Sequence, residues 1–274
     1  MHPTLLNIFG MRFHAYATML AVAFLVGTLS AVRDLNRKDP PIAITTLSGI
    51  WAFAGALIGA KAFWIIQYDS IGHLWRVAYF WESGLVFYGG LIGAMVGMFG
   101  YLKVAKLPVL PVADACAPYV ALGEAITRIG CFLNGCCWGR VSEMPWALSF
   151  PRFSPAFDQQ VHDHLLTPSA GASLPVHPTQ LYMVAGLLIA FGIMVRAARR
   201  THRAGEICVM YFFLYGVVRF TVEIFRGDCA RSVFSLTVSQ AISLGLMIAG
   251  LAGLMVMRQR KTAAIPVEEG ADAA

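Results

Sequence analysis

Charged residues are scarce in this sequence. They make up 13% of its 274 residues, while hydrophobic residues make up 58%. A soluble domain typically carries about 25% charged residues. The shortage excludes an ordinary soluble domain and favours a chain whose apolar side chains face lipid.

Long polar stretches are also few, because the apolar residues fall into runs of about 17–25 residues, the length that spans a bilayer as a helix. The sequence therefore predicts an all-α, polytopic protein with one seven-helix membrane domain over residues 1–260. Residues 139–176 form the one long hydrophilic insertion, expected as an outer loop on the lipid headgroups. Residues 261–274 are polar and acidic and are expected to be a disordered cytoplasmic tail. The expected spans are residues 16–32, 43–66, 84–102, 108–127, 179–197, 206–225 and 234–257.

Acidic residues number 15 against 21 basic ones, an excess that could suggest a nucleic-acid partner. The distribution of the basic residues argues otherwise. When the loops are assigned alternately to two sides, twelve basic residues fall on one side and seven on the other. The richer set lies in short loops at helix ends, which places it in the cytoplasm by the positive-inside rule. We therefore expect the N-terminus outside, the C-terminus cytoplasmic, and the bilayer, not nucleic acid, as partner.

The chain lacks the standard zinc pattern, in which one C-x2-4-C pair is joined by a second pair elsewhere. Cys131, Cys136 and Cys137 instead follow a C-x4-C-C pattern. No metal site is therefore expected. These residues and Cys229 are expected near the outer face, where thiols can be oxidised. A disulfide is compatible with the sequence, which does not assign one.

The segment from Arg128 to Arg140 is polar and rich in thiols, yet it follows a long apolar run. An arginine at the end of a span is costly to bury and usually has a functional partner. The glycines of this segment allow a ligand to approach the backbone closely. The segment is typical of a reaction site at the membrane surface.

Tyr215, Arg219 and Glu223 are spaced i, i+4, i+8 and share one face of the sixth expected span. One interpretation is a structural ion pair between Arg219 and Glu223. The other is that Arg219 binds an anionic headgroup through its guanidinium fork while Glu223 orients it. With Arg128 as a second cation and Asn134 as an amide donor, the pattern indicates a phosphodiester site.

Other candidates have two interpretations each. His177 titrates near neutrality and could act as a base, or it could be an interfacial hydrogen-bonding residue. Tyr16 could reach the same cavity or serve as an interfacial anchor. Gly89 and Gly90 could make room for a ligand or allow close helix packing, as expected for Gly93 and Gly97.

Several stretches together resemble the prolipoprotein diacylglyceryl transferase family. Their order and spacing match over roughly residues 12–257. The stretches are Phe87-Tyr88-Gly89-Gly90, Arg128 to Gly139, Pro145-Trp146, His177 to Tyr182, and Tyr215-Gly-x-x-Arg219-Phe220-x-x-Glu223.

The resemblance implies a multi-pass enzyme of the bacterial inner membrane. It would move the diacylglyceryl group of phosphatidylglycerol onto the cysteine thiol of a prolipoprotein and release glycerol phosphate, with no metal or diffusible cofactor. The implied catalytic residues are Arg128, Arg219, Glu223 and Tyr88. The implied substrate-binding residues are Tyr16, Gly89, Gly90, Cys131, Asn134, Gly135, Cys136, His177, Gln180 and Tyr215.

Four positions depart from the family pattern. Tyr88 stands where the family has histidine, Cys131 replaces asparagine, and Cys136 and Met183 each replace glutamate. Alternatives are therefore a paralogue with another acceptor, a phospholipid-binding or transport protein without catalysis, and a thiol-redox membrane protein. A binding protein would take up phospholipid but release no glycerol phosphate.

Overall fold

The computed structural model describes residues 4–8, 11–37, 47–69, 71–79, 86–200, 203–227 and 236–259. Within these residues the chain forms eight α-helices, six of them long and apolar enough to cross a membrane. The mainly helical, multi-span architecture is therefore confirmed. The helices are α1 (Ala15–Asn36), α2 (Leu47–Tyr68), α3 (Phe87–Val104), α4 (Val109–Asn134), α5 (Pro155–His162), α6 (Thr179–Ala198), α7 (Glu206–Ile224) and α8 (Val238–Gln259).

Two features differ from the expected all-helical chain. A short antiparallel hairpin, β1 (Thr4–Ile8) and β2 (Met11–His14), precedes α1. A 3-10 helix, η1 (Ile71–Ala78), follows α2. Both segments lie outside the runs whose length predicted a span. The expected tail at 261–274 and Cys229 lie outside the described residues.

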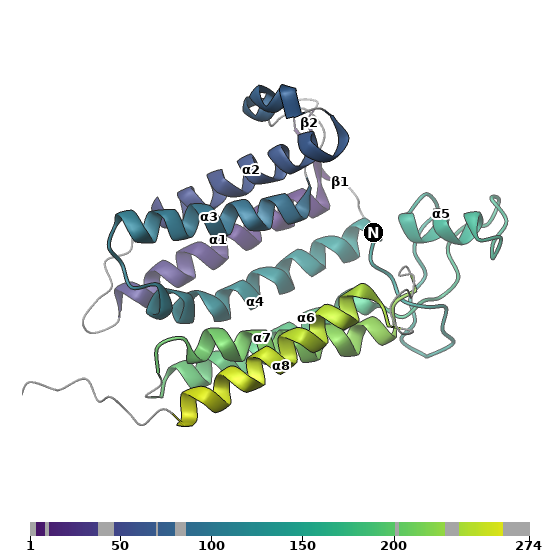
Figure 1. The fold of residues 1–274 in the computed structure, drawn as a ribbon. Helices are drawn as coiled ribbons and strands as arrows, with labels where there is room; N and C mark the ends of the chain where they lie inside the picture. The colour runs from purple at the N-terminus through teal and green to yellow at the C-terminus, as the bar shows by residue number, and fades with distance from the viewer. Residues whose placement is uncertain are drawn as a thin grey trace, which may run out of the picture.

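Helix α4 lies at the centre of the helical part (Figure 1). Helices α1, α2 and α3 lie on one side of it, and α6, α7 and α8 lie on the other. Its small residues Ala117, Ala121 and Ala125 form a buried core with Met183 and Leu187 of α6 and with residues of α7. Small side chains let helix backbones approach closely where both neighbours are apolar.

Helices α2 and α3 pack along facing glycines. A Cβ atom on Gly93 would collide with the carbonyl oxygen of Gly55, and one on Gly89 would collide with that of Gly59. Gly97 faces the carbonyl oxygen of Trp51 in the same way. The expected packing role of Gly93 and Gly97 is confirmed, and Gly89 belongs to the same interface.

Helix α4 continues to Asn134, seven residues beyond the expected end of its span. It ends because Gly135 adopts a φ of 75°, and its N–H bonds back to the carbonyls of Cys131 and Phe132. Glycine enters this left-handed region at little steric cost. As a result, Arg128 and Cys131 lie on the helix, just beyond the expected end of the span at residue 127.

The insertion at 139–176 has a core of its own. Phe150, Ala156 and Val176 are buried together, and Phe132 and Trp138 pack against them. Helix α5 is capped by Ser154, whose hydroxyl accepts a hydrogen bond from the N–H of Phe157. The insertion is therefore a small folded unit seated next to the end of α4 (Figure 1). Its contact with lipid headgroups stays a prediction.

Candidate active site

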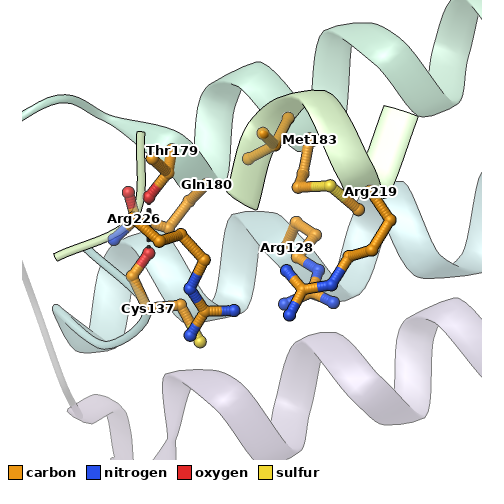
Figure 2. A pocket seen from close by; sticks show the side chains of 8 residues that line it. Arg128, Cys137, Thr179, Gln180, Met183, Arg219 and Arg226 are labelled. Carbon is orange, nitrogen blue, oxygen red and sulfur yellow. Dashed lines mark hydrogen bonds between the residues drawn. The ribbon is translucent and has the colours of Figure 1, made fainter. Parts of the chain in front are cut away.

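Two arginines from separate helices meet near the C-terminal ends of α4 and α7. Arg128 of α4 pairs with Glu124, with 2.9 Å between Nη2 and Oε1. Arg219 of α7 pairs with Glu223, with 3.0 Å between Nη2 and Oε2. Both pairs are spaced i, i+4, so one helix face holds each cation. Figure 2 shows both guanidinium groups directed toward the same space.

Glu223 is fully buried and holds more than one partner. Besides Arg219, Arg226 lies 3.8 Å away, from its Nη1 to Oε2. The Thr237 hydroxyl donates a 2.9 Å hydrogen bond to Oε1. The structural ion pair predicted as one interpretation therefore exists, and it also fixes the direction of the Arg219 fork. Arg219 in turn donates a 3.0 Å hydrogen bond to the hydroxyl of Ser239 on α8.

A small cavity of about 10 Å³, room for roughly one water molecule, lies among these groups. Three arginines border it, and within the described residues Glu124 and Glu223 form ion pairs with them. The buried Arg128 Nε and Gln180 Oε1 atoms have no hydrogen-bond partner within the described residues. Three guanidinium groups converge on this cavity, so the arrangement suits an anion. The lining residues are Arg128, Cys137, Thr179, Gln180, Met183, Arg219, Val222 and Arg226.

Three thiols lie together at the edge of this cavity. The Sγ atoms of Cys131, Cys136 and Cys137 all lie within 4.8 Å of one another, and all three cysteines are free. Hydrogen bonds from Cys131 and Cys136, and then the charges of Arg226 and Arg128, hold the pKa of the Cys137 thiol below its ordinary value. Thiolate is the reactive and metal-binding form of cysteine.

Comparison of the sequence with known proteins identifies the family. The family model described as prolipoprotein diacylglyceryl transferase matches residues 3–256. The chain belongs to this family. A protein of Clostridium tetani named phosphatidylglycerol–prolipoprotein diacylglyceryl transferase is 30% identical over 267 residues, covering 95% of this chain and all of that protein.

Two further relatives carry the same name. The Mannheimia succiniciproducens protein is 31% identical over 255 residues, covering 90% of this chain and 87% of that protein. One from Pseudomonas aeruginosa is 30% identical over 274 residues, covering 96% of each. The resemblance read from the motifs is thus confirmed along nearly the whole chain.

Besides Arg128, Arg219 and Gln180, which border the cavity, several residues predicted for the site interact with these arginines or with the thiols. Tyr215 interacts electrostatically with both Arg128 and Arg219. Tyr16, at the start of α1, interacts in the same way with Cys131, Arg128 and the other two thiols. Asn134 hydrogen-bonds with Cys136, and Gly135 forms the turn that brings the thiols back toward α4.

Other predicted residues lie elsewhere. Gly89 and Gly90 face α2, Gly90 opposite Ala56 and Ala60. His177 packs against Phe225, with 5.2 Å between ring centroids, and its Nδ1 lies 3.2 Å from the Tyr182 hydroxyl. None of the three borders the cavity, so their substrate-binding roles stay predictions. Tyr88 is the second residue of α3, and its side chain lies outside the described part.

The sequence reasoning missed four residues of this site. Glu124 precedes Arg128 by one helical turn, a spacing that could have identified it. Arg226 follows Arg219 by two turns but lies beyond the helix end. Thr179 and Cys137 meet only through folding: the Thr179 hydroxyl donates a 2.7 Å hydrogen bond to the Cys137 carbonyl.

Proposed function

We propose that this protein transfers the diacylglyceryl group of phosphatidylglycerol to the thiol of a prolipoprotein cysteine and releases glycerol phosphate. The names of its relatives state this activity for them. The observation that carries the proposal is the cavity bordered by the guanidinium groups of Arg128, Arg219 and Arg226.

The phosphate of the lipid would bind among these arginines. A phosphodiester has one negative charge, and the departing phosphate monoester gains a second as the carbon–oxygen bond breaks. Guanidinium groups already fixed by Glu124 and Glu223 stabilise that added charge without reorganising in the transition state. Their planar forks match phosphate oxygens in pairs.

The remaining roles follow from position. Glu223 and Ser239 orient Arg219. Tyr16, Asn134 and Tyr215 lie beside the cations and thiols, where they can contact the headgroup or the acceptor. Tyr88 is assigned as a hydrogen-bond donor because a phenol is a poor base at neutral pH. The acyl chains stay in lipid between the helices.

The proposal includes the orientation in the membrane. We count α3 as a membrane span in addition to the six longer helices, which gives seven, since its glycine face packs along the length of α2. The site lies at the start of α1 and α6 and at the end of α4 and α7. Arg33, Lys103, Arg196 and Arg258 lie in the last turns of α1, α3, α6 and α8, at the opposite ends.

The positive-inside rule then places those basic ends in the cytoplasm. The N-terminus and the unit at 139–176 are periplasmic, the C-terminus is cytoplasmic, and the membrane is the bacterial inner membrane. Residues 1–260 form one membrane domain, followed by a cytoplasmic tail.

The decisive experiment uses the purified protein in phosphatidylglycerol vesicles with a peptide bearing a lipobox cysteine. Mass spectrometry should detect a diacylglyceryl thioether on the peptide, and an enzymatic assay should detect glycerol phosphate. A peptide with serine in place of cysteine should give neither product. Lipid binding without release of glycerol phosphate would favour a non-catalytic phospholipid-binding protein instead.

A further inference from the structure

The proposed reaction needs a thiolate acceptor, and the cavity offers few groups that could generate one. Apart from Cys137, its described lining consists of arginines and the uncharged residues Thr179, Gln180, Met183 and Val222. Glu223 is already held by Arg219 and Thr237. The sulfur cluster at the cavity edge is therefore the group to consider.

The cluster has the dimensions of a three-thiolate metal site. A Zn–S bond is about 2.3 Å long, so sulfur atoms sharing one zinc ion lie roughly 3.8–4.0 Å apart. The Sγ atoms of Cys131, Cys136 and Cys137 are already within 4.8 Å of one another. Side-chain rotations that shorten these separations by less than about 1 Å complete the site.

The backbone of the cluster is fixed from outside it. Gln180 donates a 2.7 Å hydrogen bond to the carbonyl of Cys136, and Thr179 does the same for Cys137. Cys137 has a φ of 59°, which non-glycine residues adopt at a cost and which is found at functional sites. These contacts orient the peptide groups, and the only hydrogen bond from a sulfur of the cluster to the backbone that we find within the described residues is a long one, 3.7 Å from Cys136 Sγ to the Cys131 carbonyl.

The sequence pattern argued against a standard zinc site, because no second pair accompanies the C-x4-C-C run. Two positive-φ residues of the segment, Gly135 and Cys137, change that conclusion, because they fold the chain back against the last turn of α4. Zinc suits the cluster because thiolates favour soft or borderline ions over Mg²⁺ or Ca²⁺. Three protein ligands also leave the fourth position open, as in catalytic zinc sites.

The surrounding charge fits the same ion. A zinc ion held by three thiolates has a net negative charge, and a fourth thiolate adds another. Cys137 interacts electrostatically with Arg226 and Arg128, so two guanidinium groups can offset that charge. Figure 2 shows the Arg226 guanidinium beside the sulfur of Cys137.

We infer that Cys131, Cys136 and Cys137 bind Zn²⁺ and present its open fourth position to the acceptor cysteine. This rests on the proposed function. A thiol that coordinates zinc is deprotonated by it, so the ion supplies an acceptor thiolate next to the arginines that hold the phosphate.

The step balances without an oxidant or reductant. The acceptor thiol loses its proton to water on coordination. Its sulfur then attacks the glyceryl carbon, a carbon–sulfur bond forms, and the bond from that carbon to the phosphate oxygen breaks. Glycerol phosphate leaves with the electron pair, and the thioether product, a weaker ligand than thiolate, dissociates from the ion.

Metal binding is tested directly on the full-length protein in phosphatidylglycerol nanodiscs, stripped with a chelator under reducing conditions. Titration should give one Zn²⁺ per chain. Co²⁺ should give the absorption of a tetrahedral thiolate site. Adding the lipobox peptide should change that spectrum, whereas the peptide with serine should not.

Variants separate this site from the other thiols. Cys131→Ser and Cys137→Ser should each weaken zinc binding on the order of 100-fold or more, since loss of a ligand exceeds the effect of a supporting residue. The control, Cys116→Ser with Cys208→Ser, should bind zinc as the parent does. Size-exclusion chromatography and phosphatidylglycerol binding establish that each variant is folded.

Activity then distinguishes the two proposals. Removing the metal should slow transfer at least about 10-fold, and Zn²⁺ should restore it. Full transfer by metal-free protein, a disulfide within the cluster of the native protein, or no zinc binding would overturn the inference. If the cobalt spectrum responds to the cysteine peptide but no glycerol phosphate forms, the metal site is supported and the transferase proposal fails.

Discussion

At the scale of single residues, the site depends on how each charge is held. Arg128 and Arg219 keep only 18% and 13% of their side-chain surface exposed, and each has one carboxylate partner. A fixed, partly desolvated guanidinium acts on a phosphate more strongly than a mobile one in water. The direction of each fork therefore matters as much as its charge.

Replacing Arg128 separates charge from geometry. Arg128→Ala should lower kcat on the order of 100-fold, the effect of losing one donor to a developing anion. Arg128→Lys should recover only a small part, because an ammonium group cannot make the paired contact. The rate of glycerol phosphate release gives kcat for both variants.

The matched control is Arg152→Lys in the folded unit at 139–176. The Arg152 guanidinium lies over the Phe153 ring, 4.8 Å from its centroid, and does not border the cavity. Its kcat should equal that of the parent. Full activity of Arg128→Ala would remove this residue from the mechanism.

At the scale of elements, two contacts fix the helices that carry the site. The glycine face of α3 sets its distance from α2. Asp114 of α4 accepts hydrogen bonds from the N–H groups of Gly205 and Cys208, at 2.6 and 2.9 Å. Because α7 has no capping side chain of its own, a carboxylate from another helix completes its first turn.

Gly93→Ala should destabilise the protein by roughly 1–3 kcal/mol, since the new methyl group would push α3 away from the backbone of Gly55. Gly100→Ala, on the same helix, is the control, because nothing lies within 4 Å of its would-be Cβ. Unfolding followed by thermal denaturation in detergent compares the two. Equal melting temperatures would contradict close packing of α2 on α3.

Asp114→Ala should cost about 1–3 kcal/mol, because two buried N–H groups at the start of α7 lose their acceptor. Asp114→Asn should cost less, since its amide oxygen still accepts one bond. Chemical denaturation in detergent gives the difference. Asp163→Ala, on an exposed side chain of the surface unit, should leave the unfolding midpoint unchanged.

At the scale of the whole molecule, the residues that border the cavity lie at one end of the helices and the basic last turns of α1, α3, α6 and α8 at the other. The membrane potential and the positive-inside rule would keep that direction fixed. The headgroup and the acceptor would then meet at the periplasmic surface, and the acyl chains would remain in the bilayer.

This orientation is measurable by cysteine labelling in intact cells. Leu165→Cys, at a position 55% exposed on the surface unit, should react with a membrane-impermeant maleimide added outside. Arg199→Cys, after α6, should react only once the inner membrane is permeabilised. The labelling of both variants is compared with that of the parent, because the parent's own six cysteines can also react. The reverse pattern would invert the topology.

The sequence by itself determined the membrane class, most span positions, the Arg219–Glu223 face and the family. These depend on local quantities: the length of apolar runs, the spacing along one helix, and the chemistry of short motifs. The length of α4 was underestimated because Arg128 was expected to end the span, whereas the helix continues into a protein-lined end.

Only the tertiary structure decided which groups meet. Arg226, Gln180 and Cys137 border one cavity although they come from three separate segments. The three thiols converge because positive-φ turns reverse the chain, which a spacing rule does not register. Contacts between distant segments depend on how helices pack around α4, and no periodicity within one segment encodes that arrangement.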